Sequence, residues 1–120
     1  MQGREDEMDE RRLVVDADGV MVFARLEDVT YIRAEDHYVK ICFPESFIRA
    51  RGPLGRIERR LSESGFVRIH RSYLVSLRHI KRIGYGCVIL DDRRGTVLPL
   101  GVSYERRLYD EIKKQENIFL

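Results

Sequence analysis

The segment Phe66-Val67-Arg68-Ile69-His70-Arg71-Ser72-Tyr73-Leu74-Val75 carries the clearest pattern in the chain. Apolar side chains recur on both sides of the polar triplet His70-Arg71-Ser72, which is typical of two short strands joined by a bend. We expect the bend to present the triplet at the surface. All three side chains can donate hydrogen bonds to phosphate oxygens, and arginine can also bind a guanine edge. The alternative is that His70 and Arg71 only tie loop carbonyls together.

The β pattern extends over most of the chain. Further strand-like runs lie at residues 13–15, 20–24, 29–34, 38–43, 47–51, 80–83, 87–90 and 96–98. They are separated by turn-forming clusters such as Asp16-Ala17-Asp18-Gly19. The sequence therefore predicts a mainly β domain with eight to ten short strands.

Two stretches have helical periodicity instead. Apolar residues three or four apart occur at Leu54, Ile57 and Leu61, and again at Tyr104, Leu108 and Ile112. Pro53 and Gly65 fit the two ends of the first helix, and Ser103 is the expected N-cap of the second. We predict one short internal helix, with Arg56, Arg59 and Arg60 on its solvated face, and one C-terminal helix.

The length of 120 residues suits one domain, and a hydrophobic fraction of 43% can fill one core. Residues 1–12 hold three arginines and five acidic residues, a net charge of −2, which leaves +4 for the remainder. We expect a charged tail or linker remnant at 1–12, a domain at 13–116 and a C-terminal tail at 117–120. A basic domain is compatible with nucleic-acid binding but does not require it.

Cysteine usage and hydropathy indicate a cytoplasmic protein. Cys42 and Cys87 lie in apolar runs and match no metal-ligand spacing, so two buried thiols are expected, with a disulfide or redox switch as the alternative. No run approaches the length of a membrane span, and no apolar signal segment follows Met1. We predict no metal, no cofactor and no membrane partner.

A second candidate site is Asp36-His37-Tyr38-Val39-Lys40, a polar loop that enters a strand. His37 could read a base edge there and Lys40 could contact a phosphate, whereas the alternative is an ordinary hairpin corner.

In Asp91-Asp92-Arg93-Arg94-Gly95 the charges cancel, so a solvated hairpin tip is expected. No G-x-S-x-G elbow or phosphate-binding glycine loop occurs, and the three histidines match no common metal site, so we do not predict an enzyme.

Three segments also follow the pattern of a known family. The segment at 66–75 resembles F-x-R-x-H-R-S-x-x-V-N, and Val29-Thr30-Tyr31-Ile32-Arg33-Ala34-Glu35-Asp36-His37-Tyr38-Val39 resembles I-x-Y-I-E-A-x-x-x-Y-V. Leu98-Pro99-Leu100-Gly101-Val102-Ser103-Tyr104 resembles the segment before that family's last helix. The order is the same, and the resemblance covers about residues 13–114. The chain is thus similar to the LytTR family, the DNA-binding output domains of bacterial response regulators and related sensors.

The resemblance implies about ten strands in small antiparallel sheets with short helices. It also implies loops inserted into successive major grooves of double-stranded DNA, bending of that DNA, and two copies bound to repeated half-sites. A longer parent chain would carry an N-terminal receiver or sensor domain.

Carried over by residue, the resemblance assigns one base contact to His37 or Tyr38 and a second to Arg71 with His70 beside it. The family's third contact is an arginine just before the last helix, where this chain has Val102. That contact is therefore either absent or shifted by one residue. Phosphate contacts are expected from Lys40, Arg68, Ser72 and Ser103.

The predicted function is sequence-specific binding of double-stranded DNA by a bacterial transcription regulator. The alternative is a β module for protein interaction or ligand sensing that has lost DNA binding, which the small net charge and Val102 favour. A third class, single-strand or RNA binding, needs exposed aromatic platforms. Most of the tyrosines that could serve, at 31, 38, 73 and 85, fit strand cores instead.

Overall fold

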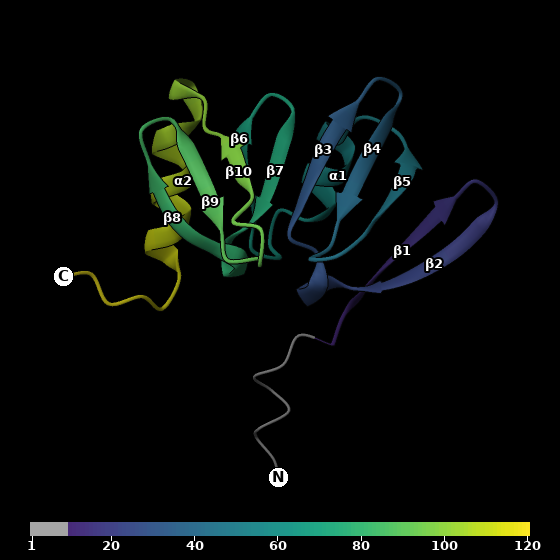
Figure 1. The fold of residues 1–120 in the computed structure, drawn as a ribbon, viewed down its shortest axis with the longest axis horizontal. Coiled ribbons are helices and arrows are strands. Elements are labelled where there is room, and N and C mark those ends of the chain that lie inside the picture. Colours follow the sequence, from purple (N-terminus) through teal and green to yellow (C-terminus); the bar gives the residue numbers. More distant parts are fainter. Residues whose placement is uncertain (1–9) are drawn as a thin grey trace, which may run out of the picture.

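The computed structural model describes residues 10–120, and within them it has ten strands in three antiparallel sheets and two α-helices (Figure 1). The strands are β1 (Arg12–Ala17), β2 (Val20–Arg25), β3 (Tyr31–Glu35), β4 (Tyr38–Cys42), β5 (Phe47–Arg51), β6 (Phe66–His70), β7 (Tyr73–Ser76), β8 (Ile80–Gly84), β9 (Cys87–Leu90) and β10 (Val97–Pro99). The helices are α1 (Leu54–Arg60) and α2 (Glu105–Lys114), and short 3-10 turns lie at Leu26–Asp28, Leu77–His79 and Val102–Tyr104. The predicted mainly β fold is confirmed.

The central element is a five-stranded sheet with the strand order β5-β4-β3-β7-β6. Side chains alternate between its two faces, so Ile32, Val39 and Ile41 lie on one face and are almost fully buried. That face packs against α1 and the β1–β2 hairpin to form the first core cluster. The opposite face has two halves, and the described part of the chain packs a second core cluster over the β7–β6 half.

The second core cluster covers that half. Val67, Ile69 and Val75 point from β6 and β7 toward Val88, Leu90 and Leu98 of the β8–β9–β10 sheet. Leu108 of α2 has no exposed surface and joins the same cluster. Among residues 10–120, no element covers the β3–β4–β5 half of this face in the same way, because the β8–β9–β10 sheet lies beside it (Figure 1).

Three hairpins close through two-residue turns: Asp18-Gly19, Asp36-His37 and Tyr85-Gly86. Their first residues all have positive φ values, between 53° and 55°. This conformation gives the backbone twist that joins two adjacent antiparallel strands. The β6–β7 hairpin turns at Arg71-Ser72 instead, with a register shift between Arg68 and His70.

Some expectations need correction. Ser103 is not the N-cap of α2: it lies inside a 3-10 turn, because the Tyr104 amide donates to the Gly101 carbonyl (2.9 Å), and the helix starts after Tyr104. Both thiols are free, but Cys87 is only partly buried. Burial raises the pKa of the Cys42 thiol above its ordinary value.

The predicted tail lies mostly outside the described residues, and Arg12 already belongs to β1. No helix among residues 10–120 has the length and apolar character needed to cross a membrane.

Candidate nucleic-acid interface

Four connections meet at one end of the molecule, at the top of Figure 1. They are the β3–β4 turn, the β6–β7 turn, the β8–β9 turn and the segment between β10 and α2. We call this region the loop edge and define it by Asp36, His37, Arg71, Ser72, Tyr85, Gly86, Val102 and Ser103.

Backbone hydrogen bonds join these connections. The Ala34 amide donates to the Ser72 carbonyl (2.9 Å), and the Gly101 amide donates to the Ile69 carbonyl (2.8 Å). The Leu100 amide donates to the Gly86 carbonyl (2.9 Å). The fold therefore holds together the three segments that the sequence singled out, together with the β8–β9 turn.

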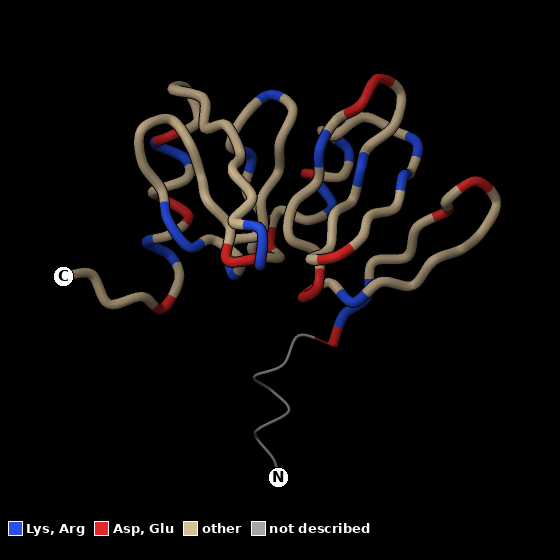
Figure 2. The backbone as a smooth tube through the Cα atoms, in the orientation of Figure 1, with Lys and Arg blue, Asp and Glu red and all other residues tan. Residues whose placement is uncertain are grey.

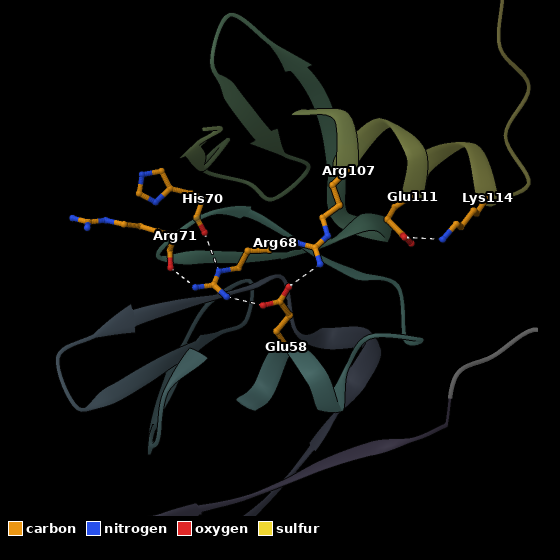
Figure 3. A network of polar contacts seen from close by, with 7 residues as sticks. All are labelled: Glu58, Arg68, His70, Arg71, Arg107, Glu111 and Lys114. Carbon is orange, nitrogen blue, oxygen red and sulfur yellow. Dashed lines mark hydrogen bonds and ion pairs between the residues drawn. The ribbon is translucent and has the colours of Figure 1, made fainter. Parts of the chain in front are cut away.

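The Arg71 turn is anchored from inside by Arg68 (Figure 3). The Arg68 Nε donates to the His70 carbonyl (3.0 Å), and its Nη2 donates to the Arg71 carbonyl. Its Nη1 donates to the Glu58 carboxylate of α1 (2.6 Å). Only 17% of the Arg68 side chain is exposed, so this guanidinium is committed to the turn and the helix.

Glu58 links three elements. One carboxylate oxygen accepts from Arg68 of β6, and the other lies 3.6 Å from Nη2 of Arg107 on α2 (Figure 3). The Arg107 side chain is 58% exposed, so its pairing with Glu58 is weaker than that of Arg68. The Glu58–Arg68 pair is thus the main polar connection between α1 and the Arg71 turn.

Arg71 and His70 extend away from this network in Figure 3. Arg71 is exposed, and no described residue pairs with its guanidinium. The Ser72 amide donates to the Nδ1 of His70 (3.1 Å), so the proton of the neutral ring lies on Nε2, where it can be donated outward. The His70 ring packs edge-on against Tyr73 with centroids 5.6 Å apart. Carbonyl bridging, the alternative role for His70 and Arg71, is performed by Arg68.

The other expected residues fall on two surfaces. His37 is exposed at the tip of its turn, and its carbonyl accepts from the Gly52 amide (3.1 Å), which fixes the tip to the end of β5. Ser103 is exposed on the loop edge. Tyr38 and Lys40, by contrast, lie on the open half of the central sheet, beside rather than on the loop edge.

Tyr85 is a loop-edge residue that the sequence reasoning did not select. It occupies the first position of the β8–β9 turn with a φ of 53° and is fully exposed, and Val102 nearby on the loop edge is 84% exposed. The signal was present, because a tyrosine directly before Gly86 at a two-residue turn cannot lie in a strand core. The loop edge therefore offers apolar contact surface as well as hydrogen-bond donors.

Charge is unevenly distributed over the molecule. Figure 2 shows a basic tip on the β6–β7 turn, where the sequence has Arg71, and acidic residues at the neighbouring β3–β4 turn. Arg93 and Arg94 lie at the other end of β9, away from the loop edge. No group of three or more His, Cys, Asp or Glu side chains within residues 10–120 is placed to hold a metal ion.

Comparison with known proteins agrees with this architecture. The model of the LytTr DNA-binding domain family matches residues 19–113. A solved LytTr DNA-binding domain from Bacillus cereus superposes with a TM-score of 0.70 at 22% identity, covering 85% of this chain and 96% of that one. That likeness shows the shared fold.

Two curated relatives are regulators. The CO-responsive transcriptional regulator RcoM of Rhodospirillum rubrum is 35% identical over 92 residues, which cover 72% of this chain and 38% of RcoM. The sensory transduction protein LytT of Bacillus subtilis is 26% identical over 105 residues, which cover 82% of this chain and 42% of LytT. The chain thus spans about two fifths of the length of these relatives.

Proposed function

Because this chain belongs to the LytTR family of DNA-binding domains, we propose that it binds specific sequences in double-stranded DNA through its loop edge, as the output domain of a bacterial transcription regulator. The family is a DNA-binding domain and not a class of enzyme.

The observation that carries the proposal is the exposed Arg71, whose guanidinium pairs with no residue among 10–120, on a turn whose carbonyls are held by Arg68. Because Arg68 holds the backbone carbonyls of the turn, the turn itself loses little freedom on binding, and the Arg71 guanidinium can donate two hydrogen bonds to a guanine in the major groove. His70, with its outward Nε2 proton, and His37 at the adjacent tip would read neighbouring base edges. The hydroxyls of Ser72 and Ser103 would hold phosphates.

Arg68 takes a different role in this proposal from the one expected from the sequence. Its three donor groups are used by Glu58 and two carbonyls, so it acts as a positioning residue for Arg71 and not as a phosphate contact. Tyr38 and Lys40, on the neighbouring sheet surface, would contact only the DNA backbone that flanks the bases read by the loop edge. Val102 and Tyr85 would supply apolar contacts to sugars or thymine methyl groups.

The length of the two relatives bears on the domain architecture of the parent protein. Their greater length fits a parent protein in which a receiver or sensor domain precedes this one, and we propose a cytoplasmic regulator of that kind. We also propose that two copies occupy repeated half-sites, since each loop edge covers only a short stretch of groove.

The experiment is selection of bound sequences from a random duplex pool, followed by titration of the selected site. Arg71→Ala should weaken specific binding by about 1–3 kcal/mol, or roughly fivefold to 150-fold, and relax the preference at one base position. The matched control is Arg93→Ala, an exposed arginine at the other end of β9, which should bind like the wild type.

Two results would overturn the proposal. An Arg71→Ala variant with unchanged specificity would remove the role of the turn. A wild-type chain with no steep salt dependence on any duplex would instead favour the alternative, a protein-interaction or ligand-sensing module.

A further inference from the structure

The open half of the central sheet is a row of cations. The outward positions of β3, β4 and β5 place Arg33 opposite Lys40 and Lys40 opposite Arg49, so three positive side chains cross three neighbouring strands. Two positions further along β4, Tyr38 lies opposite Arg51. Figure 2 shows these basic positions side by side on the three strands. We call Arg33, Lys40, Arg49 and Arg51, with the rings of Tyr38 and Phe47, the basic sheet face.

This row of positive charges destabilises the folded state unless negative charges compensate it. Like charges directly opposite one another on adjacent strands are unfavourable, because neighbouring strands lie only about 4.8 Å apart. Glu35 pairs with Arg49 (3.1 Å), and within residues 10–120 no carboxylate pairs with Arg33, Lys40 or Arg51. The basic sheet face therefore keeps three uncompensated positive charges, which fit an anionic partner.

The aromatic rings narrow the choice of partner. The Lys40 ammonium lies 4.2 Å and the Arg49 guanidinium 5.1 Å from the centroid of the Phe47 ring. The Arg51 guanidinium lies 5.1 Å from the centroid of the Tyr38 ring. Rings already occupied by cations serve poorly as stacking platforms for the bases of a single strand. They do hold the cations in place for a phosphate backbone.

The basic sheet face is continuous with the loop edge. Tyr38 directly follows His37, and the Gly52 amide that binds the His37 carbonyl (3.1 Å) directly follows Arg51. The Arg33–Lys40–Arg49 row then lies about 7 Å further along the strands. A duplex held at the His37 tip would therefore pass the basic sheet face with its flanking backbone.

We propose that the basic sheet face binds the sugar-phosphate backbone of duplex DNA flanking the bases that the loop edge reads. This inference rests on the proposed function and adds that affinity depends on the length of the flank. Arg33 stands at the glutamate position of the family segment I-x-Y-I-E-A, so this chain departs from that pattern at one end of the row.

The test compares two duplexes that carry the selected site, one cut at its ends and one extended by about ten base pairs on both sides. The variant is Arg33→Gln with Lys40→Gln, which removes two cations without adding acids. The matched control is Lys81→Gln with Arg82→Gln on β8, two exposed residues that carry the same charge change. Thermal unfolding of all three proteins confirms that they are folded at the assay temperature.

The wild type and the control should bind the extended duplex more tightly than the cut one. The Arg33/Lys40 variant should lose about tenfold to fiftyfold on the extended duplex, with the salt slope reduced by about 2, and almost nothing on the cut duplex. An equal loss on both duplexes, or none on either, would overturn the inference and leave the proposed function intact.

Two further arms separate the remaining outcomes. A larger loss on an extended single strand than on the extended duplex would make the face a single-strand platform and overturn the inference. Failure of the wild type to bind any duplex would overturn the proposed function, and this inference with it.

Discussion

The anchor of the Arg71 turn gives the sharpest test of the structure. Replacing Arg68 with alanine removes the donors to the His70 and Arg71 carbonyls and leaves the Glu58 carboxylate with only the longer contact to Arg107. We expect both a less stable domain and a turn that samples other conformations.

The magnitude follows from burial. The Glu58–Arg68 pair is short and mostly shielded, with exposed fractions of 23% and 17%, so its loss should cost about 2 kcal/mol. The exposed Arg71 carbonyl can accept a hydrogen bond from water in the variant, so its loss of Arg68 costs little. The half-buried His70 carbonyl loses its donor, which should add about 1 kcal/mol to the cost of the substitution. A total of about 3 kcal/mol lowers the unfolding midpoint by about 10 °C in a domain of this size.

The assay is thermal unfolding followed by circular dichroism, with Arg107→Ala as the matched control. Arg107 contacts the same carboxylate from a largely exposed position, so its removal should cost less than about 0.5 kcal/mol. DNA titration at a temperature well below both midpoints then measures how the loss of the anchor changes DNA affinity through the conformation of the turn. If Arg71 keeps its binding conformation one tenth of the time in Arg68→Ala, the affinity falls about tenfold.

An Arg68→Ala midpoint within about 2 °C of the Arg107→Ala midpoint would refute the anchoring role of Arg68. A double-mutant cycle between Arg68 and Glu58 that gives no coupling would refute it as well. Full DNA affinity in a destabilised Arg68→Ala variant would show that the turn keeps its shape without the anchor.

Three further perturbations test other parts of the structure. Tyr85→Asn should raise the unfolding midpoint by a few degrees, because asparagine tolerates the φ of 53° better, yet weaken DNA binding; a lower midpoint would contradict the turn assignment. Gly101→Ala should cost about 1–2 kcal/mol in chemical denaturation, since the new Cβ would lie 3.0 Å from the Tyr104 ring, and unchanged stability would show that the ring moves aside easily. Burial tends to raise the pKa of the Asp92 carboxyl, but hydrogen bonds from Thr96 and Gly95 outweigh burial and lower that pKa overall. The ionised carboxylate therefore stabilises the fold above about pH 4, and this stabilisation is lost as the pH falls further. In Asp92→Asn the unfolding midpoint should therefore depend less on pH between about pH 6 and pH 2 than in the wild type. An unchanged pH dependence would contradict this role of Asp92.

The local sequence pattern was sufficient to predict the strands and the hairpins. Alternating apolar residues predicted β4 and the pair β6–β7, and a three-and-four spacing predicted α1. The start of α2 was predicted wrongly because the Gly101 carbonyl accepts from the Tyr104 amide and forms a 3-10 turn first. That contact depends on how the segment after β10 packs against β6, which no local residue pattern contains.

The candidate site was predicted in part. The exposed positions of His37, Arg71 and Ser103 on one edge agree with the sequence analysis, although their contacts with DNA stay predictions. The inward turn of Arg68 was not foreseen, because its partner Glu58 lies ten residues earlier on a different element.

The amino-acid order alone determined which segments are extended, which are helical and which polar triplet sits at a bend, because each of these depends on neighbours a few residues apart. Only the tertiary structure decided which arginine of the triplet region points inward and that Arg33, Lys40 and Arg49 form one row. Strand register and the covering of one half of the sheet depend on packing between distant segments, and a shift of register by one residue would turn every side chain of a strand to the other face.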